Sequence, residues 1–281
     1  MARYLRMNDT PLERHFTLIV GNSLPFKVQG FGPDRKHLLI KSAFHHQVKV
    51  TPLAVNNKNI EQRLKFEAIS VSAVPVLIRA YAHNGWQDMG TEALHITVLP
   101  ELKLPPVDSE EGILARVLLV ENIPPSSREF QSMTQAITSM QWMRHVLMNR
   151  LKFGSRHFGA DNVSSITALI KARNQVEGFQ SYPALTGQQS INLKDIVRIA
   201  NDASDQRHAA CREYVQNAID VATGINPGSD PSPTRLYAWK TADARHPGAN
   251  FVKFQTQGGQ DFYTLTREFK EDPLLRNVKK P

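Results

Sequence analysis

Residues 113–127, ILARVLLVENIPPSS, join an apolar helical pattern to a single carboxylate. Ile113 and Val117 precede Glu121 at four-residue steps, so one face of a helix carries all three side chains. Glu121 therefore continues an apolar stripe, where partial burial raises the pKa of a carboxyl toward the range of a general acid. The prolines at 124–125 end the helix just beyond it. On helix geometry alone, the commoner alternative is a glutamate that frays into solvent at a helix end.

Helical periodicity continues through the second half of the chain. After the proline-rich linker KLPPVDSEEG, Asp108 is a predicted N-cap, and Glu110 and Glu111 suit the positive end of the helix dipole. Cys211 falls on an apolar stripe and is expected to be packed core. The spacing of apolar residues predicts helices over 109–121, 129–151, 163–175, 193–204 and 208–223. Aromatic-rich strands are predicted around 235–239, 250–254 and 261–265.

The chain before residue 105 has a different pattern. Short runs such as FTLIV, HLLIKSAF and ALHITVLPEL are rich in Val, Ile and Phe, and turns such as GFGPDR and HNGW separate such runs. This pattern predicts a small antiparallel β-domain over 1–104, either a sandwich or a barrel, with a role in wall binding, targeting or delivery left open. With a mostly helical domain and a small β-element over 105–281, we expect an α+β protein.

Composition narrows the function classes. The chain has 281 residues, 41% of them hydrophobic and 21% charged, so it can bury a substantial core. Its single cysteine excludes an internal disulfide framework and a cysteine-rich zinc site. The first residues lack the apolar run of a signal peptide, and no stretch is as long as a membrane span. We therefore expect a protein made in the cytoplasm, with no membrane span, no metal site and no cofactor.

The net charge of +8 indicates an anionic partner or only solubility. The basic residues are spread along the chain, and no zinc-finger spacing, RNP-type aromatic signature or basic zipper is present. A bacterial cell wall is also polyanionic. On charge alone, a nucleic acid is thus a minor alternative as the anionic partner, and the sequence indicates no specific nucleic-acid-binding site.

Several segments together resemble the SleB-type cell wall hydrolases, the family of spore-cortex-lytic enzymes. Leu114-Ala115-Arg116 and Glu121 match the family's Leu-Ala-Arg-like helix that ends in its catalytic Glu. Asn149-Arg150, in WMRHVLMNRL, match the Asn-Arg that ends its second helix. Three later segments match in the family's order: Gln175 in ITALIKARNQVEGF, Asp230-Pro231 followed by Tyr237 in a tyrosine-rich strand, and Phe262-Tyr263 in GGQDFYTL. The resemblance covers about residues 110–265.

The sequence departs from the family in its residues at two places, and the interval from Glu121 to Asn149 is longer than usual. Asn122-Ile123-Pro124-Pro125 stand where the family has a small residue and then Arg-Gly-Glu. Val176 replaces a Phe, and Glu177 follows it where a small polar residue is usual. These departures indicate a distant relative with altered substrate subsites.

The resemblance implies a lysozyme-like fold that cleaves peptidoglycan between N-acetylmuramic acid and N-acetylglucosamine, with Glu121 as general acid and base. Many members of the family are lytic transglycosylases, which need one such carboxyl. A hydrolase would need a second carboxylate. Glu177 is the candidate for that role, and a solvated loop glutamate is its alternative.

Five further residues are candidates for substrate binding. Asn149 is expected to hold the active-site loop or only to cap its helix, and Gln175 to contact an N-acetyl group or lie at a helix end. The aromatic residues Tyr237, Trp239 and Tyr263 lie on predicted strands, where they would stack on sugar rings or fill the core of the small sheet.

Three classes of function remain open: a peptidoglycan glycosidase or lytic transglycosylase, a non-catalytic wall- or carbohydrate-binding protein, and a nucleic-acid-binding protein. For the first class we expect an antibacterial effector of a type VI secretion system that acts in the periplasm of a target bacterium, with a phage lysin as the alternative. Such an effector would have a glycan strand, an immunity protein and a secretion-machine component as partners.

Overall fold

The computed structural model describes residues 3–30, 36–56, 61–85, 87–89, 92–161 and 163–272. The chain divides into two compact units, Met1–Glu101 and Leu102–Pro281. This boundary lies three residues before the predicted one, which falls between residues 104 and 105. Strands build the first unit, and helices with a small sheet build the second, so the α+β prediction is confirmed. No helix in the described part of the chain is long and apolar enough to cross a membrane.

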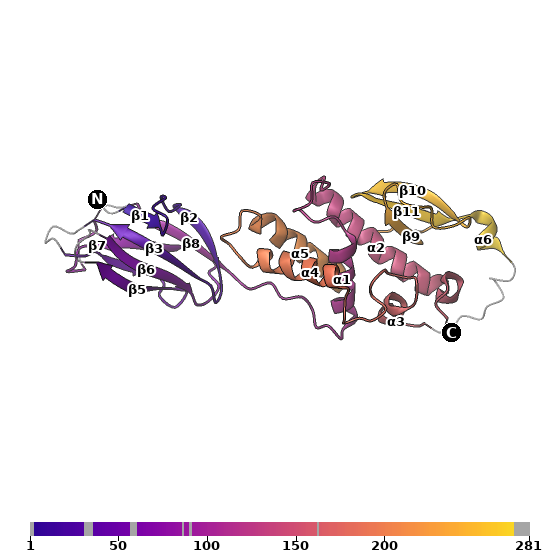
Figure 1. The fold of residues 1–281 in the computed structure, drawn as a ribbon, viewed down its shortest axis with the longest axis horizontal. Helices are drawn as coiled ribbons and strands as arrows, with labels where there is room; N and C mark the ends of the chain where they lie inside the picture. The colour runs from indigo at the N-terminus through magenta and orange to yellow at the C-terminus, as the bar shows by residue number, and fades with distance from the viewer. Residues whose placement is uncertain are drawn as a thin grey trace. The chain divides into compact units, whose positions relative to one another are not determined.

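Two four-stranded sheets make up the described part of the first unit (Figure 1). The first sheet has the order β1 (Arg3–Arg6), β3 (Ser23–Gln29), β6 (Glu61–Ala68) and β5 (Val48–Asn56). The second has the order β2 (His15–Ile19), β8 (Leu94–Leu99), β7 (Val76–Tyr81) and β4 (Leu39–Ser42).

One core lies between these two sheets, which makes the unit a β-sandwich. Phe26 and Phe66 of the first sheet stack with ring centroids 3.9 Å apart. They share their buried cluster with Ile78 and Ile96 of the second sheet, and all four side chains are fully buried. Alternation of buried and exposed positions along β6, β7 and β8 supplies this inner face.

The prediction of a purely antiparallel domain is wrong at one pairing. Strands β2 and β8 are parallel, in a register that runs from His15 opposite His95 to Ile19 opposite Leu99. The chain between these strands passes through both sheets, so no hairpin forces them to be antiparallel.

Strands β1 and β3 carry no clear strand signal in the sequence. Pro25 interrupts the pattern of β3, because proline cannot donate to a sheet ladder. The pairing of β1 with β3 ends at Phe26, so Pro25 lies beyond the reach of β1 and its missing N–H disrupts no bond on that side. The sheet thus tolerates a proline in an inner strand.

The second unit holds six helices and a three-stranded antiparallel sheet among its described residues. The helices are α1 (Glu110–Glu121), α2 (Met133–Phe153), α3 (Ile166–Lys171), α4 (Gly187–Ala200), α5 (His208–Thr223) and the short α6 (Arg267–Glu271), with a 3₁₀ turn at Ser155–Phe158. The sheet has the order β10 (Phe251–Gln257), β11 (Gln260–Leu265) and β9 (Ala238–Thr241), and it lies along α2 (Figure 1).

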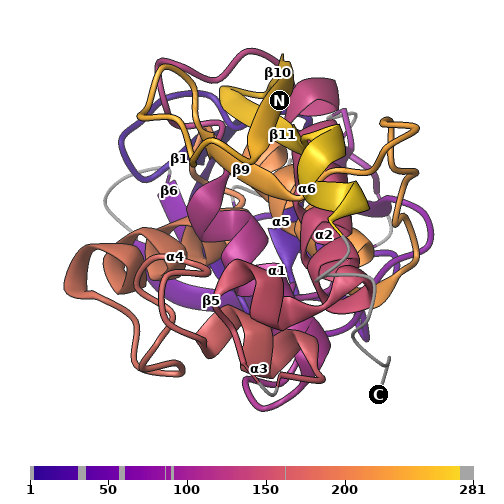
Figure 2. The same ribbon diagram turned by 90° about the vertical axis from the view of Figure 1, so that its right-hand side faces the viewer.

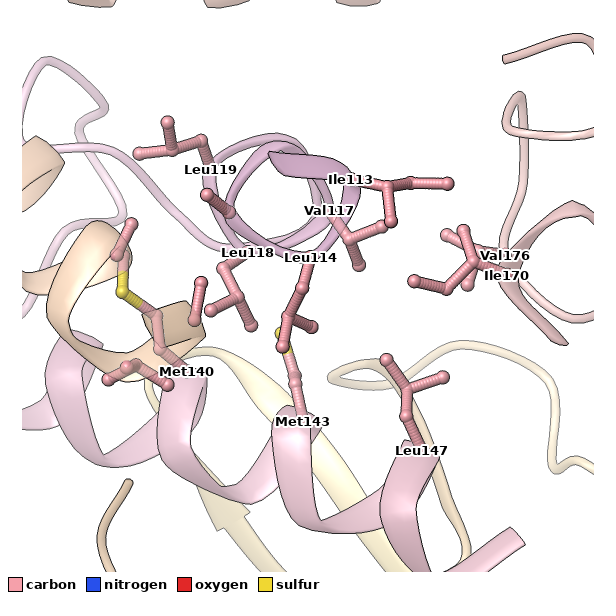
Figure 3. Packing of buried hydrophobic residues seen from close by; sticks show 14 of the residues in the cluster. Ile113, Leu114, Val117, Leu118, Leu119, Met140, Met143, Leu147, Ile170 and Val176 are labelled. Carbon is pink, nitrogen blue, oxygen red and sulfur yellow. The ribbon is translucent and has the colours of Figure 1, made fainter. Parts of the chain in front are cut away.

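Helix α1 lies at the centre of this unit, in contact with α2, α3, α4 and α5 (Figure 2). It is buried nearly all round, which is more than the single apolar stripe that the spacing predicts. In Figure 3 its side chains point to two groups of apolar residues. Leu114 and Leu118 point to Met140, Met143 and Leu147 of α2, and Ile113 and Val117 point to Ile170 and Val176. This packing holds the helix whose last residue is Glu121.

The start of α1 is fixed by its cap and by the linker. Ser109, and not the predicted Asp108, is the N-cap, because its hydroxyl accepts the N–H of Gly112 at 2.9 Å. A Cβ on Gly112 would lie 1.7 Å from the carbonyl oxygen of Pro106. Only glycine lets the linker backbone pass this close to the helix.

The hairpin between β10 and β11 docks its turn against α2 and the end of α1. A Cβ on Gly258 would lie 2.9 Å from the carbonyl oxygen of Gln135, and a Cβ on Gly259 would lie 2.2 Å from Ile123 Cδ1. Behind the turn, Phe262 packs edge-on against Trp142 with ring centroids 5.1 Å apart. The sheet is therefore seated against the helices next to Glu121.

Helix α5 has the predicted limits, with Gly224 in the left-handed conformation after it, and Cys211 is fully buried as expected. Other limits differ. Helix α2 begins at Met133 because Ser132 caps it, and α3 is confined to six residues between its cap Ser165 and Ala172. Helix α4 begins before its predicted start, in the polar stretch from Gly187, which gives no apolar period.

We expect Gly112→Ala to destabilise the second unit by about 1–3 kcal/mol, because the added methyl group forces the linker away from α1. Gly187→Ala is the matched control, since a Cβ there meets nothing within 4 Å and the residue begins a helix. Urea unfolding followed by the circular dichroism of the helices measures both. Equal stability of the two variants would contradict the close approach at Gly112.

Candidate active site

The carboxyl group of Glu121 is held by the small sheet. Trp239 of β9 donates its indole N–H to Glu121 Oε2 at 3.2 Å. Gln260 of β11 donates its side-chain amide to the backbone carbonyl of Glu121 at 2.9 Å, which satisfies a carbonyl in the last turn of α1. Glu121 is partly buried, so the alternative of a glutamate fraying into solvent does not describe this residue.

The chain after Glu121 is fixed by the residue at which the sequence departs from the SleB-type pattern. Asn122 is buried, and its amide donates to the carbonyl of Ala136 in α2 at 2.8 Å. The hydroxyl of Tyr214 in α5 donates to the carbonyl of Asn122 at 3.1 Å. Asn122 thus ties the end of α1 to two neighbouring helices. The packed helix α1 holds the backbone before Glu121, and Asn122 holds the backbone after it.

Burial is the main cause of an altered pKa at Glu121. Removal from water disfavours the charged form and raises the pKa above its ordinary value. The hydrogen bond from Trp239 partly opposes this rise, the negative charge of Glu177 adds to it, and the positive charge of Lys240 lowers it. The net effect is a carboxyl group that keeps its proton to a higher pH than an exposed glutamate.

Glu121 lies where two cavities meet. The two cavities have volumes of about 450 Å³ and about 540 Å³, and Glu121, Glu177 and Thr241 line both. We call them the amide cavity and the arginine cavity. The other residues of the amide cavity are Leu119, Val120, Asn122, Pro124, Ser126, Ser127, Gln188, Gln189, Asn192, Asp195, Ile196 and Ile199. Those of the arginine cavity are Arg150, Asn174, Gln175, Val176, Gln180, Trp239, Lys240 and Ala244.

Arg150 is the most deeply placed cation of the site. Its Nε donates to the carbonyl of Tyr237 at 2.7 Å, and Nη1 donates to Gln175 Oε1 at 2.9 Å. The ring of Phe158 lies 5.3 Å from its Cζ. Burial lowers the pKa of Arg150 to about 10, so it stays charged at neutral pH.

The predicted pair Glu121 and Glu177 is brought together, since both line both cavities and the charge of one affects the pKa of the other. Glu177 is exposed, and its backbone carbonyl accepts the amide of Gln189 at 3.0 Å. Its carboxylate therefore faces solvent at the junction, where a second acid or base could act.

Two predicted substrate-binding residues lie in the arginine cavity. Trp239 lines it but is only 8% exposed, so it offers little area for a stacked sugar ring. Gln175 also lines it, yet its amide oxygen accepts Arg150 and its amide nitrogen donates to the carbonyl of Phe158 at 2.6 Å. Gln175 acts here as a support for Arg150.

Three predicted substrate-binding residues, Asn149, Tyr237 and Tyr263, line neither cavity. The amide of Asn149 donates to Asp230 at 2.6 Å and to the carbonyl of Leu236 at 2.9 Å, which holds the loop before β9. Tyr237 and Tyr263 are 3% and 2% exposed. Tyr237 packs against Phe153 and Phe158, and Tyr263 packs edge-on against His246 with ring centroids 5.1 Å apart, so other aromatic rings take up both side chains.

Four residues of the site were not singled out in the sequence: Gln260, Asn122, Arg150 and Lys240. Arg150 belongs to the matched Asn-Arg motif, but the sequence gives it no role. Asn122 belongs to the segment that departs from the SleB-type pattern. Gln260 follows the two glycines of QGGQ, a turn signal that places it on a hairpin but does not show which helix end the hairpin meets. Among the residues that the structure describes, no group of three His, Cys, Asp or Glu side chains could hold a metal ion.

No protein-family model matches the chain, and no curated protein matches it. A solved structure of domains 1–6 of the surface layer protein SbsC aligns with a TM-score of 0.25 and 12% identity over 39% of this chain. A structure of domains 5–6 of the S-layer protein SbsC aligns with a TM-score of 0.24 and 10% identity over 35%. The chain spans 14% and 48% of those two structures. Neither score indicates a shared fold, so neither informs the function of this protein.

We expect Glu121→Gln to gain stability over the wild type as the pH rises. A carboxyl whose folded pKa lies above its ordinary value of 4.5 gives the wild type its full stability below that pH, and this stability is lost as the pH rises through the folded pKa. Glutamine cannot ionise and escapes the loss. Calorimetric melting of both proteins from pH 4 to pH 7 measures the difference, and a difference that shrinks with rising pH would refute the pKa direction.

Proposed function

We propose that this protein cleaves the glycan strand of peptidoglycan between N-acetylmuramic acid and N-acetylglucosamine, with Glu121 as the general acid and base. The observation that carries the proposal is the position of Glu121: a partly buried carboxyl of raised pKa at the junction of two cavities. Two cavities that share one acid suit a polymer whose scissile bond lies between bound sugars. The resemblance to SleB-type hydrolases supports the choice of polymer.

In the first step the protonated carboxyl of Glu121 gives its proton to the glycosidic oxygen as the bond to the muramic acid anomeric carbon breaks through an oxocarbenium-like transition state. The N-acetylglucosamine leaves with that proton as a free hydroxyl. The carboxylate of Glu121 then removes the proton of the muramic acid hydroxyl that closes the anhydro ring on the anomeric carbon. The proton is restored to Glu121, and no water is consumed.

The second carboxylate decides between two outcomes. If Glu177 activates a water or forms a covalent intermediate, the products carry reducing ends. If Glu177 acts only through its charge, Glu121 suffices and the products carry anhydro ends. Trp239 and Gln260 serve either outcome as positioning residues, because they fix the carboxyl and the helix end that bears it.

We expect Glu121→Gln to lower the release of muropeptides from purified sacculi by at least about 10²-fold, since an acid–base group contributes about 10²–10⁴ to a rate. Glu213→Gln, an exposed position on α5 that lines neither cavity, is the matched control and keeps wild-type activity. Mass spectrometry of the products identifies anhydro or reducing ends. If the wild type binds sacculi but releases no products, the protein is a wall-binding protein and the proposal of an enzyme is wrong.

We expect Glu177→Gln to move the alkaline limb of the activity profile to lower pH. Glu121 must be protonated to act as the acid, and removal of the neighbouring negative charge lowers its pKa. A profile of kcat/KM against pH measures the shift. If the rate instead falls by about 10²-fold or more at every pH, Glu177 takes part directly in the chemistry.

The proposed substrate lies outside the cytoplasmic membrane of a bacterium, and we extend the proposal to an antibacterial effector that acts in the periplasm. Expression of the chain in a bacterium, with and without an added export signal, tests this. Lysis only with the signal, and not with Glu121→Gln, is expected. Harmlessness of the exported wild type would overturn the effector role and leave the enzymatic proposal to the sacculus assay.

A further inference from the structure

The two cavities that meet at Glu121 differ in charge. Arg150 and Lys240 line the arginine cavity. Among the described residues that line the amide cavity there is no lysine or arginine, and Asp195 adds a carboxylate to the shared Glu121 and Glu177. The remaining polar groups of the amide cavity are amides and hydroxyls. A substrate with charge on one side would therefore bind in only one orientation.

Arg150 is held by neutral groups. Its partners are the carbonyl of Tyr237, the amide oxygen of Gln175 and the ring of Phe158. None of the salt bridges among the described residues includes Arg150. A guanidinium has five N–H donors in a fixed fork that matches a carboxylate, and these two hydrogen bonds use only part of it.

A cation taken from water without a counter-charge is costly, and a bound anion offsets that cost. The exposed Lys240 lies on the same cavity, on the strand β9 that also carries Trp239. The two cations thus sit on the side of Glu121 from which Trp239 donates to its carboxyl. The arginine cavity therefore offers two cations to a negatively charged group of a ligand.

We propose that the arginine cavity binds the sugar that carries a carboxylate and that the amide cavity binds the neutral sugar. This inference rests on the proposed function. N-acetylmuramic acid differs from N-acetylglucosamine by a lactyl group, whose carboxyl is either free or extended by a peptide that bears carboxylates of its own. The muramic acid whose anomeric carbon reacts then lies against Arg150 and Lys240, and the leaving N-acetylglucosamine lies among the amides.

This orientation gives Gln175 a defined task. Its amide bridges the guanidinium of Arg150 and the backbone carbonyl of Phe158, so it fixes the direction of the cation. Arg150 and Lys240 become specificity-determining residues, and Gln175 becomes a positioning residue for one of them.

Binding to the intact, inactive Glu121→Gln protein tests the inference apart from catalysis. The probes are a tetrasaccharide of alternating N-acetylglucosamine and N-acetylmuramic acid with free lactyl carboxylates, and the same tetrasaccharide with those groups methyl-esterified. We expect the free acid to bind about tenfold more tightly, because a hydrogen bond to a charged group contributes about that factor. We also expect it to shift the Nε–H resonance of Arg150. Equal affinities, no binding of either probe, or an unmoved Arg150 resonance would overturn the inference.

Exposed lysines supply variants that leave the fold intact. Lys240→Gln should reduce the preference for the free acid several-fold, whereas Lys194→Gln, which removes an exposed lysine of α4 lining neither cavity, should leave it unchanged. The same loss in both variants would show a general charge effect and contradict the orientation. The sacculus assay separates the two proposals: a preference for the free acid without cleavage refutes the enzyme alone, and cleavage with equal affinities refutes the orientation alone.

Discussion

The hydrogen bond from Trp239 to Glu121 joins two elements that lie 118 residues apart in the chain. This hydrogen bond can form only if α1 ends at Glu121 and β9 lies against that end of the helix. The central packing of α1, the buried Asn122 and the contact of Gln260 with the last turn each serve that condition. The site is thus a consequence of how a small sheet is seated on a helical core.

Placing an acid at the end of a buried helix lowers stability at neutral pH. The surrounding core offsets this loss, because α1 packs against four helices and the hairpin turn fits closely against α2 and against Ile123, just after α1. A carboxyl so constrained has few alternative positions. Rigidity and a raised pKa therefore arise from the same burial, and both are properties that a general acid requires.

Much of the fold follows from patterns within single segments. The apolar period of residues 208–223 and the glycine after it predict α5 because every signal is local. The parallel pairing of β2 with β8 and the proline in β3 escaped prediction, since each depends on which strand lies alongside. The start of helix α4 was also not predicted, because its first residues are polar and the packing of its later residues sets its position.

The candidate site divides in the same way. Glu121 stood out because its position on an apolar stripe is a local property, and the charge of Glu177 was placed near it through the resemblance. The functions of Arg150 and Gln175 depend on their hydrogen bonds to each other and to backbone carbonyls of other segments, which spacing does not encode. Tyr237 and Tyr263 are aromatic residues in strand-like segments, and only their burial against rings from other segments shows that they are packed inside the unit.

The proposed role of Glu121 as a general acid depends on the pKa of its carboxyl group. Carbon-13 labelling of glutamate, with the Glu121 resonance assigned by its loss in Glu121→Gln, gives that pKa by direct titration. We expect a value clearly above 4.5, the ordinary value of the group, and a further rise in Trp239→Phe, which removes a hydrogen bond that favours the charged form. A value at or below 4.5 would contradict the raised pKa, because Glu121 would then hold its proton no more strongly than an exposed glutamate.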